Sequence, residues 1–410
     1  MLDIWSFMVI TLNRLIGSIF ILIGTEVGAG ILALPILVAH YGFIVGCVLL
    51  FVTWLIMTYT TFVVCDINLS MPSGTNFAGM SQKIFGFWGL SVAWVCMLLI
   101  LYPIMIAYIS AAGSTFGKLL NIPTTFAIIL FVFFLSVFVI NGTSKVDFIN
   151  KILLSLKLLL LIVSCMILSK YIHYNYLTIV YKVNLQNLLI SVPVFITSFV
   201  GHIIIPTLRV YLHSDIRSIK RVLWGGCIVP LILYVLWIMV IIGNISPIGK
   251  DSVYYLNSLG NDASVGDVLE ILKNNLKIDY FMAPVLLFTT ISVSTSFLSV
   301  STALKDFLID GLKLNRIGYL YRQIYIVLLV FILPVVICLL FDKIFLKALN
   351  FVGIFCIIIS IIMPMLMVIK YKFNNIFYLT NKVIINYLVL FIGVLLLVFQ
   401  VFSLTNTLQH

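Results

Sequence analysis

Long apolar runs separated by short polar segments make up almost the whole chain. Each run has roughly the 20 residues that an α-helix needs to cross the hydrocarbon core of a bilayer. Eleven spans are predicted, at residues 13–38, 42–65, 87–112, 124–141, 146–169, 187–212, 220–243, 280–304, 323–341, 344–369 and 383–404. The pattern therefore predicts an all-α membrane protein.

Composition agrees with this prediction and narrows the partners. The 410 residues are 63% hydrophobic and 9% charged, with a mean hydropathy of +1.24, whereas soluble domains carry about 25% charged residues. A net charge of +11 would suggest nucleic acid as the partner of a soluble chain, but these basic residues lie in short loops, where they set topology. Their distribution predicts a multi-pass protein of the cell membrane with a cytoplasmic N-terminus, an extracytoplasmic C-terminus and no nucleic-acid partner.

Cysteine usage bears on metals and on redox chemistry. The seven cysteines lie within or beside apolar runs, and the sequence contains no C-x-x-C pair. This distribution argues against a disulfide framework and against a metal site. We therefore expect neither.

Three glycines, a threonine and a carboxylate interrupt the first span near its middle. The interrupted stretch is Gly24, Thr25, Glu26, Val27, Gly28, Ala29 and Gly30. Glycine costs roughly 1 kcal/mol in a helix interior, and freed backbone groups at membrane depth persist only where they are buried in protein or face water. The stretch therefore predicts a broken helix whose free N–H and carbonyl groups form a site.

The sixth span has a second interruption near half depth. It contains Ser198, Phe199, Val200, Gly201 and His202 and is followed by Pro206. Five spans that begin on the cytoplasmic side and five that begin on the outer side would form two inverted halves, each with a break in its first helix. This arrangement is typical of secondary transporters, which bind substrate between the halves.

The spans divide the chain into two repeats with connections. The predicted segments are an interfacial extension at 1–12, a first five-helix repeat at 13–170, an extracellular connection at 171–186, a second five-helix repeat at 187–370, and an eleventh helix with the C-terminus at 371–410. Residues 66–86 indicate a polar, turn-rich cytoplasmic connection.

One further helix is predicted in the outer loop at 244–279, because five apolar residues there share a helical face. They are Val265, Val268, Leu269, Leu272 and Leu276. The helix either covers the outer mouth as a lid or lies in the headgroup layer of the membrane.

Three ionisable residues lie deep within spans: Glu26, Lys157 and His202. A charge at the bilayer centre costs at least about 2.5 kcal/mol by insertion scales, so each is a functional candidate. Glu26 and Lys157 either form a structural ion pair or include a group that exchanges a proton, since burial disfavours the charged form of both. His202 either contacts the substrate or proton, or is a hydrogen-bonded packing residue.

Hydroxyl groups line two other spans. Tyr102 and Tyr108 lie in the third span, where a gate over an aromatic ligand would supply partners for their hydroxyls. The eighth span carries Ser292, Ser294, Thr295, Ser296, Ser299, Ser301 and Thr302. Such residues commonly serve helix packing, but facing the first break they could coordinate a cation. At the cytoplasmic end of this span, Lys305, Asp306 and Asp310 indicate a solvated salt-bridge cluster.

Five segments carry a family resemblance. They are NRLIGSIFILIGTEVGAGILALP from residue 13, YPIMIAYISAAGS at 102–114, SLKLLLL at 155–161, VPVFITSFVGHIIIPTL at 192–208 and STSFLSV at 294–300. Together they resemble the hydroxy and aromatic amino acid permeases of the amino acid/polyamine/organocation superfamily, the tyrosine-specific members above all. The resemblance implies the leucine-transporter fold, with a 5+5 inverted repeat and one extra helix. It also implies alternating-access, proton-coupled symport of an aromatic amino acid across a bacterial inner membrane, with tyrosine as the favoured substrate.

The resemblance also implies roles for individual residues. Lys157 matches a fifth-helix lysine that, in proton-coupled relatives, stands where other members bind sodium. The substrate would bind at Gly24, Thr25, Glu26, Gly28, Ala29, Gly30, Tyr102, Tyr108, Ser198, Phe199, Val200, Gly201 and His202, with proton coupling at Lys157 and Glu26. Two positions depart from the family: Val200 precedes a displaced Gly201 where a Ser-Phe-Gly-Phe-His motif is usual, and Glu26 replaces a small or neutral residue.

Three other functions were compared with proton-coupled symport of an aromatic amino acid. Sodium-coupled or exchange transport of another neutral amino acid is favoured by the hydroxyl-rich eighth span and opposed by Lys157. An intramembrane enzyme needs clustered acids, bases or metal ligands, and a sensor usually adds a soluble signalling domain; the sequence shows neither. We therefore expect a transporter and not an enzyme, with the proton gradient as its energy source and no cofactor.

Overall fold

The computed structural model describes residues 2–140, 143–181, 185–276, 279–316, 318–341, 343–370 and 382–407. Helices and connecting loops build this part of the chain. In chain order they are α1 (Leu2–Glu26), α2 (Ala29–Ala39), α3 (Phe43–Leu69), α4 (Phe77–Leu120), α5 (Thr124–Ile140), α6 (Thr143–Leu168), η1 (Ser169–Tyr171), α7 (Tyr174–Leu177), α8 (Leu185–Thr197), η2 (His202–Ile204), α9 (Ile205–Tyr211), α10 (Ile216–Ile242), α11 (Val253–Leu259), η3 (Gly260–Asp262), α12 (Val265–Leu276), α13 (Asp279–Gly311), η4 (Leu314–Arg316), α14 (Tyr319–Ile326), η5 (Val327–Ile332), α15 (Leu333–Leu340), α16 (Phe345–Ile357), η6 (Ile358–Ile362), α17 (Met363–Lys370) and α18 (Val383–Thr407). Residues 371–381, where the predicted final segment begins, lie outside the described residues.

The all-α prediction is confirmed. In the described residues, nine helices are long and apolar enough to cross a membrane, or ten if the bent pair α1 and α2 counts as one span. The apolar α5 is shorter, at 17 residues. The exact count of eleven spans stays a prediction.

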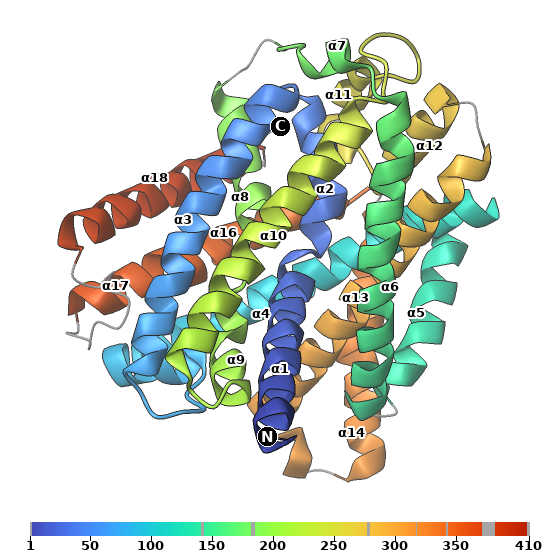
Figure 1. Ribbon diagram of the computed structural model, residues 1–410. Coiled ribbons are helices and arrows are strands. Elements are labelled where there is room, and N and C mark those ends of the chain that lie inside the picture. The colour runs from blue at the N-terminus through green and yellow to red at the C-terminus, as the bar shows by residue number, and fades with distance from the viewer. Residues whose placement is uncertain are drawn as a thin grey trace.

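The helices form a bundle with two distinct ends (Figure 1). We call the end that carries α7, α11 and α12 the lid end, and the opposite end, where α9, α14 and the start of α10 lie, the base. The broken helices pack reciprocally: α10 contacts α1 and α2, whereas α3 contacts α8 and α9. Likewise α13 contacts α6, whereas α4 contacts α16. The core of the molecule therefore consists of helices from distant parts of the sequence.

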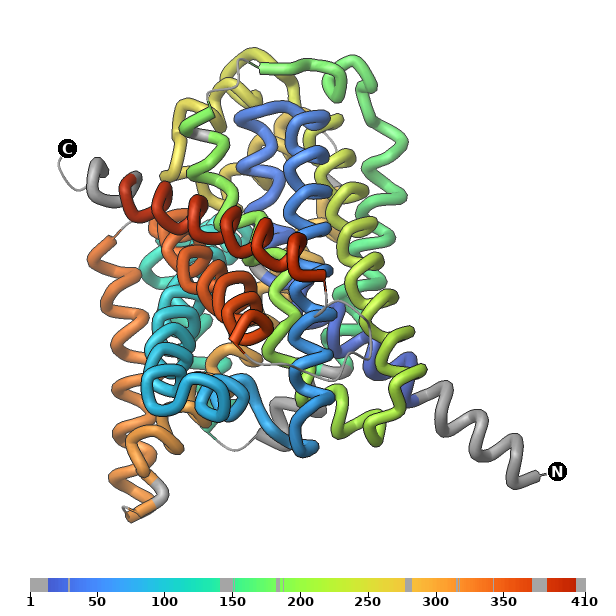
Figure 2. Tube along the Cα trace, turned by 90° about the vertical axis from the view of Figure 1, so that its left-hand side faces the viewer, coloured from blue at the N-terminus to red at the C-terminus, as the bar shows by residue number. Residues whose placement is uncertain are grey.

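The last helix, α18, lies on the outside of the bundle, on the face seen in Figure 2. Side-chain hydrogen bonds between described residues attach it. The Tyr59 hydroxyl in α3 donates to Asn386 Oδ1 at 2.6 Å, and Gln400 Nε2 donates to the Leu189 carbonyl of α8 at 2.6 Å. Much of the remaining surface of α18 is apolar and exposed, as expected for a helix that faces lipid.

The segment at 66–86 is more helical than its polar composition predicted. Helix α3 continues to Leu69, and α4 begins at Phe77, where Asn76 Oδ1 accepts a hydrogen bond from the Gly79 N–H at 2.8 Å. Asparagine is a favoured N-cap because its side chain satisfies a free amide. The helix kinks at Gly86, which has φ +67°, a conformation open to glycine. The connection therefore consists of the end of α3, a loop and a capped helical segment that leads into the third span.

The helix predicted in the outer loop is confirmed as α12. Its residues Val265, Val268, Leu269 and Leu272 are buried, and the helix contacts α4, α2 and α13. Lys118 at the end of α4 forms ion pairs with Asp267 Oδ1 at 2.9 Å and Glu270 Oε2 at 2.5 Å. The apolar face of α12 thus packs on protein, which favours the lid interpretation over a helix in the headgroup layer.

The expected solvated cluster at the end of α13 is wrong for its lysine. Lys305 is buried, and its ammonium donates to the Val139 carbonyl at 3.0 Å, near the end of α5. Among the described residues, the Asp306 carboxylate lies 3.9 Å from this ammonium. A lysine close to a helix C-terminus satisfies a carbonyl that lacks a helical partner, so Lys305 joins α13 to α5.

Candidate functional site

The first span is interrupted where the sequence predicted. Helix α1 ends at Glu26 and α2 starts at Ala29, with the two axes bent by 47°. At the break the Gly28 amide donates to the Glu26 carbonyl at 2.7 Å, and Gly28 has non-helical angles of φ −115° and ψ −115°. The carbonyls of Glu26 and Val27 are therefore released from the regular helical ladder.

The sixth span is interrupted as well. Helix α8 ends at Thr197, residues 198–201 are not helical, and the turn η2 leads into α9. Pro206 lies in the first turn of α9, where a missing N–H costs nothing. The glycine, histidine and proline signals in the sequence thus located this break correctly.

Arg209 fixes the base-side half of the second broken helix. It is buried in α9, and its guanidinium donates to the carbonyl of Asn68 and, at 2.9 Å, to the carbonyl of Met71. Both acceptors lie at or just beyond the end of α3. Helix α9 is therefore held to α3 by a charged donor on backbone carbonyls.

The two breaks interlock through their glycines. A Cβ atom on Gly30 would lie 2.2 Å from Ser198 Oγ, and a Cβ atom on Gly201 would lie 2.8 Å from Glu26 Oε1 and 2.7 Å from Leu22 Cδ1. Real Cβ atoms do not approach other atoms so closely. At Gly30 the contacts include the Ser198 Cα, so only glycine fits there without a shift of backbone, whereas at Gly201 the ends of two flexible side chains would have to move. Each break therefore accommodates a side chain of the other.

One hydroxyl joins the two breaks. Tyr234 of α10 is fully buried, and its hydroxyl lies 2.7 Å from the Glu26 carbonyl and 2.9 Å from the Ser198 carbonyl, so it can donate to either. Its ring packs edge-on against Phe199, with centroids 5.4 Å apart. Sequence reasoning missed Tyr234; the available signal was that a tyrosine hydroxyl within an apolar span needs a partner.

The two deep ionisable side chains near the first break, Lys157 and Glu26, contact different groups. Lys157 in α6 is 1% exposed, and its ammonium donates to the Val27 carbonyl in the first break. Glu26 is 2% exposed, one carboxyl oxygen lies against Gly201, and Oε2 has no hydrogen-bond partner among the described residues. Since no salt bridge between described residues joins Glu26 to Lys157, the structural ion pair considered from sequence is not formed.

His202 forms hydrogen bonds with two threonines of α3. The ring is fully buried, and Nε2 lies 2.7 Å from Thr60 Oγ1 and 3.3 Å from Thr61 Oγ1. This geometry is that of a hydrogen-bonded packing residue, one of the two alternatives for this histidine. A direct contact of His202 with substrate stays a prediction.

The two tyrosines of α4 face different surroundings. A Cβ atom on Gly28 would lie 2.7 Å from the Tyr108 hydroxyl and 3.7 Å from Ser296 Oγ of α13. The side chains of Tyr108 and Ser296 therefore flank the first break. The Tyr102 hydroxyl instead donates to the Leu329 carbonyl at 3.0 Å. That acceptor lies in the π-helical turn η5, and π turns often occur at functional sites. The Tyr102 hydroxyl thus has a backbone carbonyl as an acceptor, and contact of Tyr102 with substrate stays a prediction.

Most hydroxyls of α13 bond within their own helix. Ser294, Thr295, Ser299, Ser301 and Thr302 each donate to a carbonyl three or four residues earlier. In the described part of the chain, the buried Ser292 Oγ has no partner. This pattern agrees with a packing role for most of the row.

The remaining predicted residues divide between the site and its edge. Thr25 is exposed and donates to the Ile21 carbonyl at 2.8 Å, and Gly24 and Val200 are partly exposed. The Ala29 side chain lies outside the described part of the structure. The residues brought together around the breaks are Glu26, Gly28, Gly30, Tyr108, Lys157, Ser198, Phe199 and Gly201, joined by Tyr234 and Ser296.

Known proteins resemble the chain over nearly its whole length. The tryptophan/tyrosine permease family matches residues 11–400. Tyrosine-specific transport system 1 of Haemophilus influenzae is 27% identical over 363 residues, covering 88% of each chain. Glutamine transporter 2 of Aliivibrio fischeri is 25% identical over 365 residues, covering 88% of this chain and 89% of the relative.

A solved structure shows the fold. The crystal structure of MhsT in complex with L-phenylalanine is similar with a TM-score of 0.63 at 13% identity, covering 93% of this chain and 98% of MhsT. The named relatives are transport proteins, so the expectation of a membrane transporter rather than an enzyme is confirmed. With a family match that spans nearly the whole sequence, the chain belongs to the tryptophan/tyrosine permease family.

Proposed function

We propose that the protein is a proton-coupled symporter that carries an aromatic amino acid into the cytoplasm, with tyrosine as the favoured substrate. The family and the tyrosine-specific relative support the aromatic substrate. The protein would reside in a bacterial inner membrane with the base in the cytoplasm. Arg217, Lys220 and Arg221 near the start of α10 support this orientation, because basic residues favour cytoplasmic loops.

The proposed architecture is a 5+5 inverted repeat of the leucine-transporter fold. The first half would run from α1 to α6, with α5 counted as a span, the second from α8 to α17, and α18 would be the eleventh helix. The reciprocal packing supports this division, since the second helix of each half lies against the broken helix of the other. The likeness to MhsT supports the fold.

The breaks provide groups of both signs for a zwitterion. The free N–H groups at the start of α2 suit a carboxylate, and the carbonyls after α1 and α8 suit an ammonium group. Tyr108 and Ser296 lie beside Gly28, where their hydroxyls can meet the same ligand. In this proposal the substrate bridges the two halves by binding both breaks.

The contact between Lys157 and the Val27 carbonyl carries the proposal of proton coupling. A positive side chain on this carbonyl takes the place that a sodium ion would need. Loss of the proton would replace the charged donor with a neutral amine, whose hydrogen bond to the Val27 carbonyl is weaker. The hold of α6 on the break would loosen, so protonation and the position of α1 would be linked. Glu26 is the second proton candidate, because its buried carboxyl has one oxygen, Oε2, without a partner among the described residues and burial disfavours the charged form.

Proteoliposome uptake tests the role of Lys157. An imposed pH gradient should drive accumulation of labelled tyrosine by the unmodified protein, equally well with sodium or choline as the bulk cation. Lys157→Ala should lose the response to the gradient while still exchanging internal for external tyrosine. Lys170→Ala, which removes an exposed lysine beyond the same helix, is the matched control. Gradient-driven uptake that survives in Lys157→Ala would refute coupling through this residue.

Another neutral amino acid is the second candidate substrate. The glutamine transporter among the relatives favours it, and Ser292, whose hydroxyl has no partner among the described residues, favours a cation requirement. Competition of labelled tyrosine uptake by tryptophan, phenylalanine, serine, leucine and glutamine, with and without sodium, separates the candidates. Competition by aromatic amino acids alone, without a sodium effect, is the expected result.

A further inference from the structure

A cavity of about 390 Å³, which we call the rim cavity, lies at the lid end, just beyond the ends of α6 and α10. Helix α7 lies at this end of the bundle and contacts α10 (Figure 1). The lining includes Lys170, Tyr171, His173, Tyr176, Asn244 and Asn275. The stretches Ile152–Tyr171 and Ile216–Ile242 are each long and apolar enough to cross a membrane. Their ends therefore place the rim cavity at the level of the lipid headgroups.

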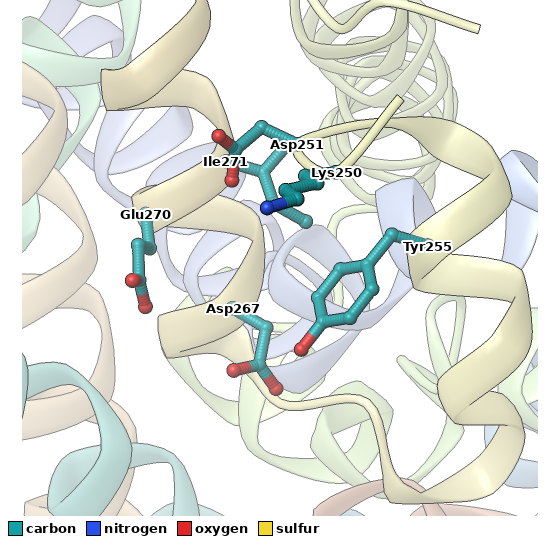
Figure 3. Close-up of a pocket in the computed structure, with 6 residues that line it drawn as sticks. All are labelled: Lys250, Asp251, Tyr255, Asp267, Glu270 and Ile271. Atoms are coloured by element: carbon teal, nitrogen blue, oxygen red, sulfur yellow. The ribbon is translucent and has the colours of Figure 1, made fainter. Parts of the chain in front are cut away.

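A second cavity, within the lid loop, has the opposite charge (Figure 3). It measures about 310 Å³ and is lined by Lys250, Asp251, Tyr255, Asp267, Glu270 and Ile271. Two of its carboxylates, on Asp267 and Glu270, are already paired with Lys118. The rim cavity instead has Lys170 and His173 in its lining and no Asp or Glu. An anion is therefore favoured in the rim cavity and disfavoured in the lid loop.

The basic side chains of the rim cavity are available to a ligand. Lys170 is exposed, and no salt bridge between described residues includes it. The His173 amide donates to the Gly243 carbonyl at 2.9 Å, and its ring packs on Tyr176 with centroids 4.9 Å apart. These contacts hold the imidazole beside the end of α10. An ammonium and a ring N–H suit a phosphate, since charge-assisted hydrogen bonds are the strong ones.

Asn244 contributes an acceptor that lacks a donor. It is 4% exposed, and its Nδ2 donates to the Leu168 carbonyl at 3.0 Å and to the Val240 carbonyl at 2.7 Å. These two bonds use both amide hydrogens and fix the orientation of the side chain. Its Oδ1 has no hydrogen-bond partner among the described residues. A buried acceptor of this kind is stabilised by a ligand that brings a hydroxyl or N–H group.

Below the rim cavity, α6 and α10 both present apolar side chains to the surroundings of the bundle. Leu159, Ile162 and Met166 of α6 are exposed, as are Ile232 and Leu236 of α10. Met166 precedes Lys170 by about one helical turn. Acyl chains of a lipid whose headgroup lies in the cavity can therefore pack on these helices. Tyr171 and Tyr176 suit the same depth, because tyrosine is enriched where a protein crosses the membrane surface.

We propose that the rim cavity binds one anionic phospholipid whose headgroup carries a free hydroxyl, such as phosphatidylglycerol. The phosphate would accept hydrogen bonds from Lys170 and His173, and the headgroup hydroxyl would donate to Asn244 Oδ1. The acyl chains would lie on the apolar surfaces of α6 and α10. This inference concerns the membrane around the protein and depends on neither the aromatic substrate nor proton coupling.

Native mass spectrometry of the purified protein with added lipids tests this site. The unmodified protein should bind phosphatidylglycerol at least fivefold more tightly than phosphatidylcholine, which has no hydroxyl donor and no net charge. Phosphatidylmethanol, which is anionic but has no headgroup hydroxyl, should bind with intermediate affinity. The double variant Lys170→Ala with His173→Ala should lose the preference for phosphatidylglycerol. The control Lys250→Ala removes an exposed lysine of the lid cavity and should keep it.

Stability in detergent gives a second readout. Phosphatidylglycerol should raise the melting temperature of the unmodified protein and of Lys250→Ala, but not that of the double variant. The double variant should still take up tyrosine in response to a pH gradient, which shows that it is folded. Lys170 lies about 20 Å along the helix from Lys157, at 1.5 Å per residue, so its loss leaves proton coupling unchanged.

Three results would overturn the lipid site. The first is equal binding of phosphatidylglycerol and phosphatidylcholine by the unmodified protein, and the second is an undiminished preference in the double variant. The third is full displacement of the lipid by an equal concentration of glycerol phosphate, which would make a soluble phosphate the occupant. Equal binding of phosphatidylglycerol and phosphatidylmethanol would overturn the contact between the hydroxyl and Asn244. None of these results bears on the transported substrate.

Discussion

The two breaks occupy equivalent places in their helices, yet they leave different groups available. The first holds the Lys157 ammonium on the Val27 carbonyl and carries the Glu26 carboxyl, whose Oε2 has no partner among the described residues. At the second, the His202 ring is bonded to α3, and Ser198 packs against Gly30. Ionisable groups thus converge on the first break, whereas contacts with neighbouring helices fix the second. We infer that the first break moves and exchanges protons while the second positions the ligand.

The glycines give the sharpest test of this difference. A Cβ atom on Gly30 would lie 2.9 Å from the Ser198 Cα, so Gly30→Ala must displace backbone. Overpacking of this kind costs about 1–3 kcal/mol, and we expect tyrosine uptake in proteoliposomes to fall at least tenfold. At Gly201 the nearest atoms are the ends of the flexible Leu22 and Glu26 side chains, so Gly201→Ala should retain most of the uptake.

A compensating change checks the cause of the Gly30→Ala defect. Ser198→Gly removes the Oγ and Cβ atoms that the new methyl group would meet at 2.2 and 2.6 Å. The double variant should therefore recover part of the lost uptake, whereas Gly30→Ala with Gly201→Ala should not. Equal losses at Gly30 and Gly201 would contradict the asymmetry between the breaks.

Tyr234→Phe removes the link between the breaks and should have the next largest effect. It removes the donor shared by the carbonyls of Glu26 and Ser198. The Glu26 carbonyl keeps the Gly28 amide, but a buried carbonyl left unsatisfied costs about 1–3 kcal/mol. We expect a lower melting temperature in detergent and a lower maximal rate of uptake. Tyr174→Phe, at a tyrosine that is 71% exposed, should change neither. An unaltered rate in Tyr234→Phe would show that the breaks work without this hydroxyl.

Local chemistry explains how much of this site the sequence revealed. Glycines and charges are unfavourable in a spanning helix, so their positions within apolar runs of the sequence were enough to locate both breaks and Lys157. The partners could not, because they come from contacts between distant residues. Tyr102 reaches a carbonyl 227 positions away. This carbonyl lies in a π-helical turn, and Pro334, five residues later, has no N–H to bond it. Lys305 and Tyr234 were misjudged or missed for the same reason: their acceptors are backbone carbonyls, whose position depends on the fold.

The second break should tolerate loss of a contact that only fixes its position. Thr60→Val removes the closer hydroxyl beside His202 Nε2. The free energy of unfolding should fall by about 1 kcal/mol, the usual net value of one hydrogen bond, with no change in the pH profile of uptake. Thr178→Val, at an exposed threonine, serves as the control. A shifted pH profile in Thr60→Val would instead indicate that His202 exchanges a proton. It would contradict the inference that only the first break exchanges protons.

The smallest expected effect concerns the lid helix α12, which contacts α2, the outer half of the first broken helix. Burial alone would raise the pKa of Asp267, but hydrogen bonds from Lys118 and Ser264 outweigh it and hold the pKa below its usual range. A carboxyl with a lowered pKa stabilises the folded state above its unfolded pKa, about 4. It loses that contribution as the pH falls through the folded value.

Hydrogen exchange of the α12 amides measures this contribution. After correction for intrinsic rates, protection should be constant from pH 8 to about 5 and decrease below about 4. Asp267→Asn should lower protection at every pH above that range, since the neutral amide cannot pair with Lys118. Asp215→Asn, at the N-cap of α10 near the base, should leave α12 unchanged. Loss of protection in α12 without faster exchange in α2 would show that the lid opens independently of the first break.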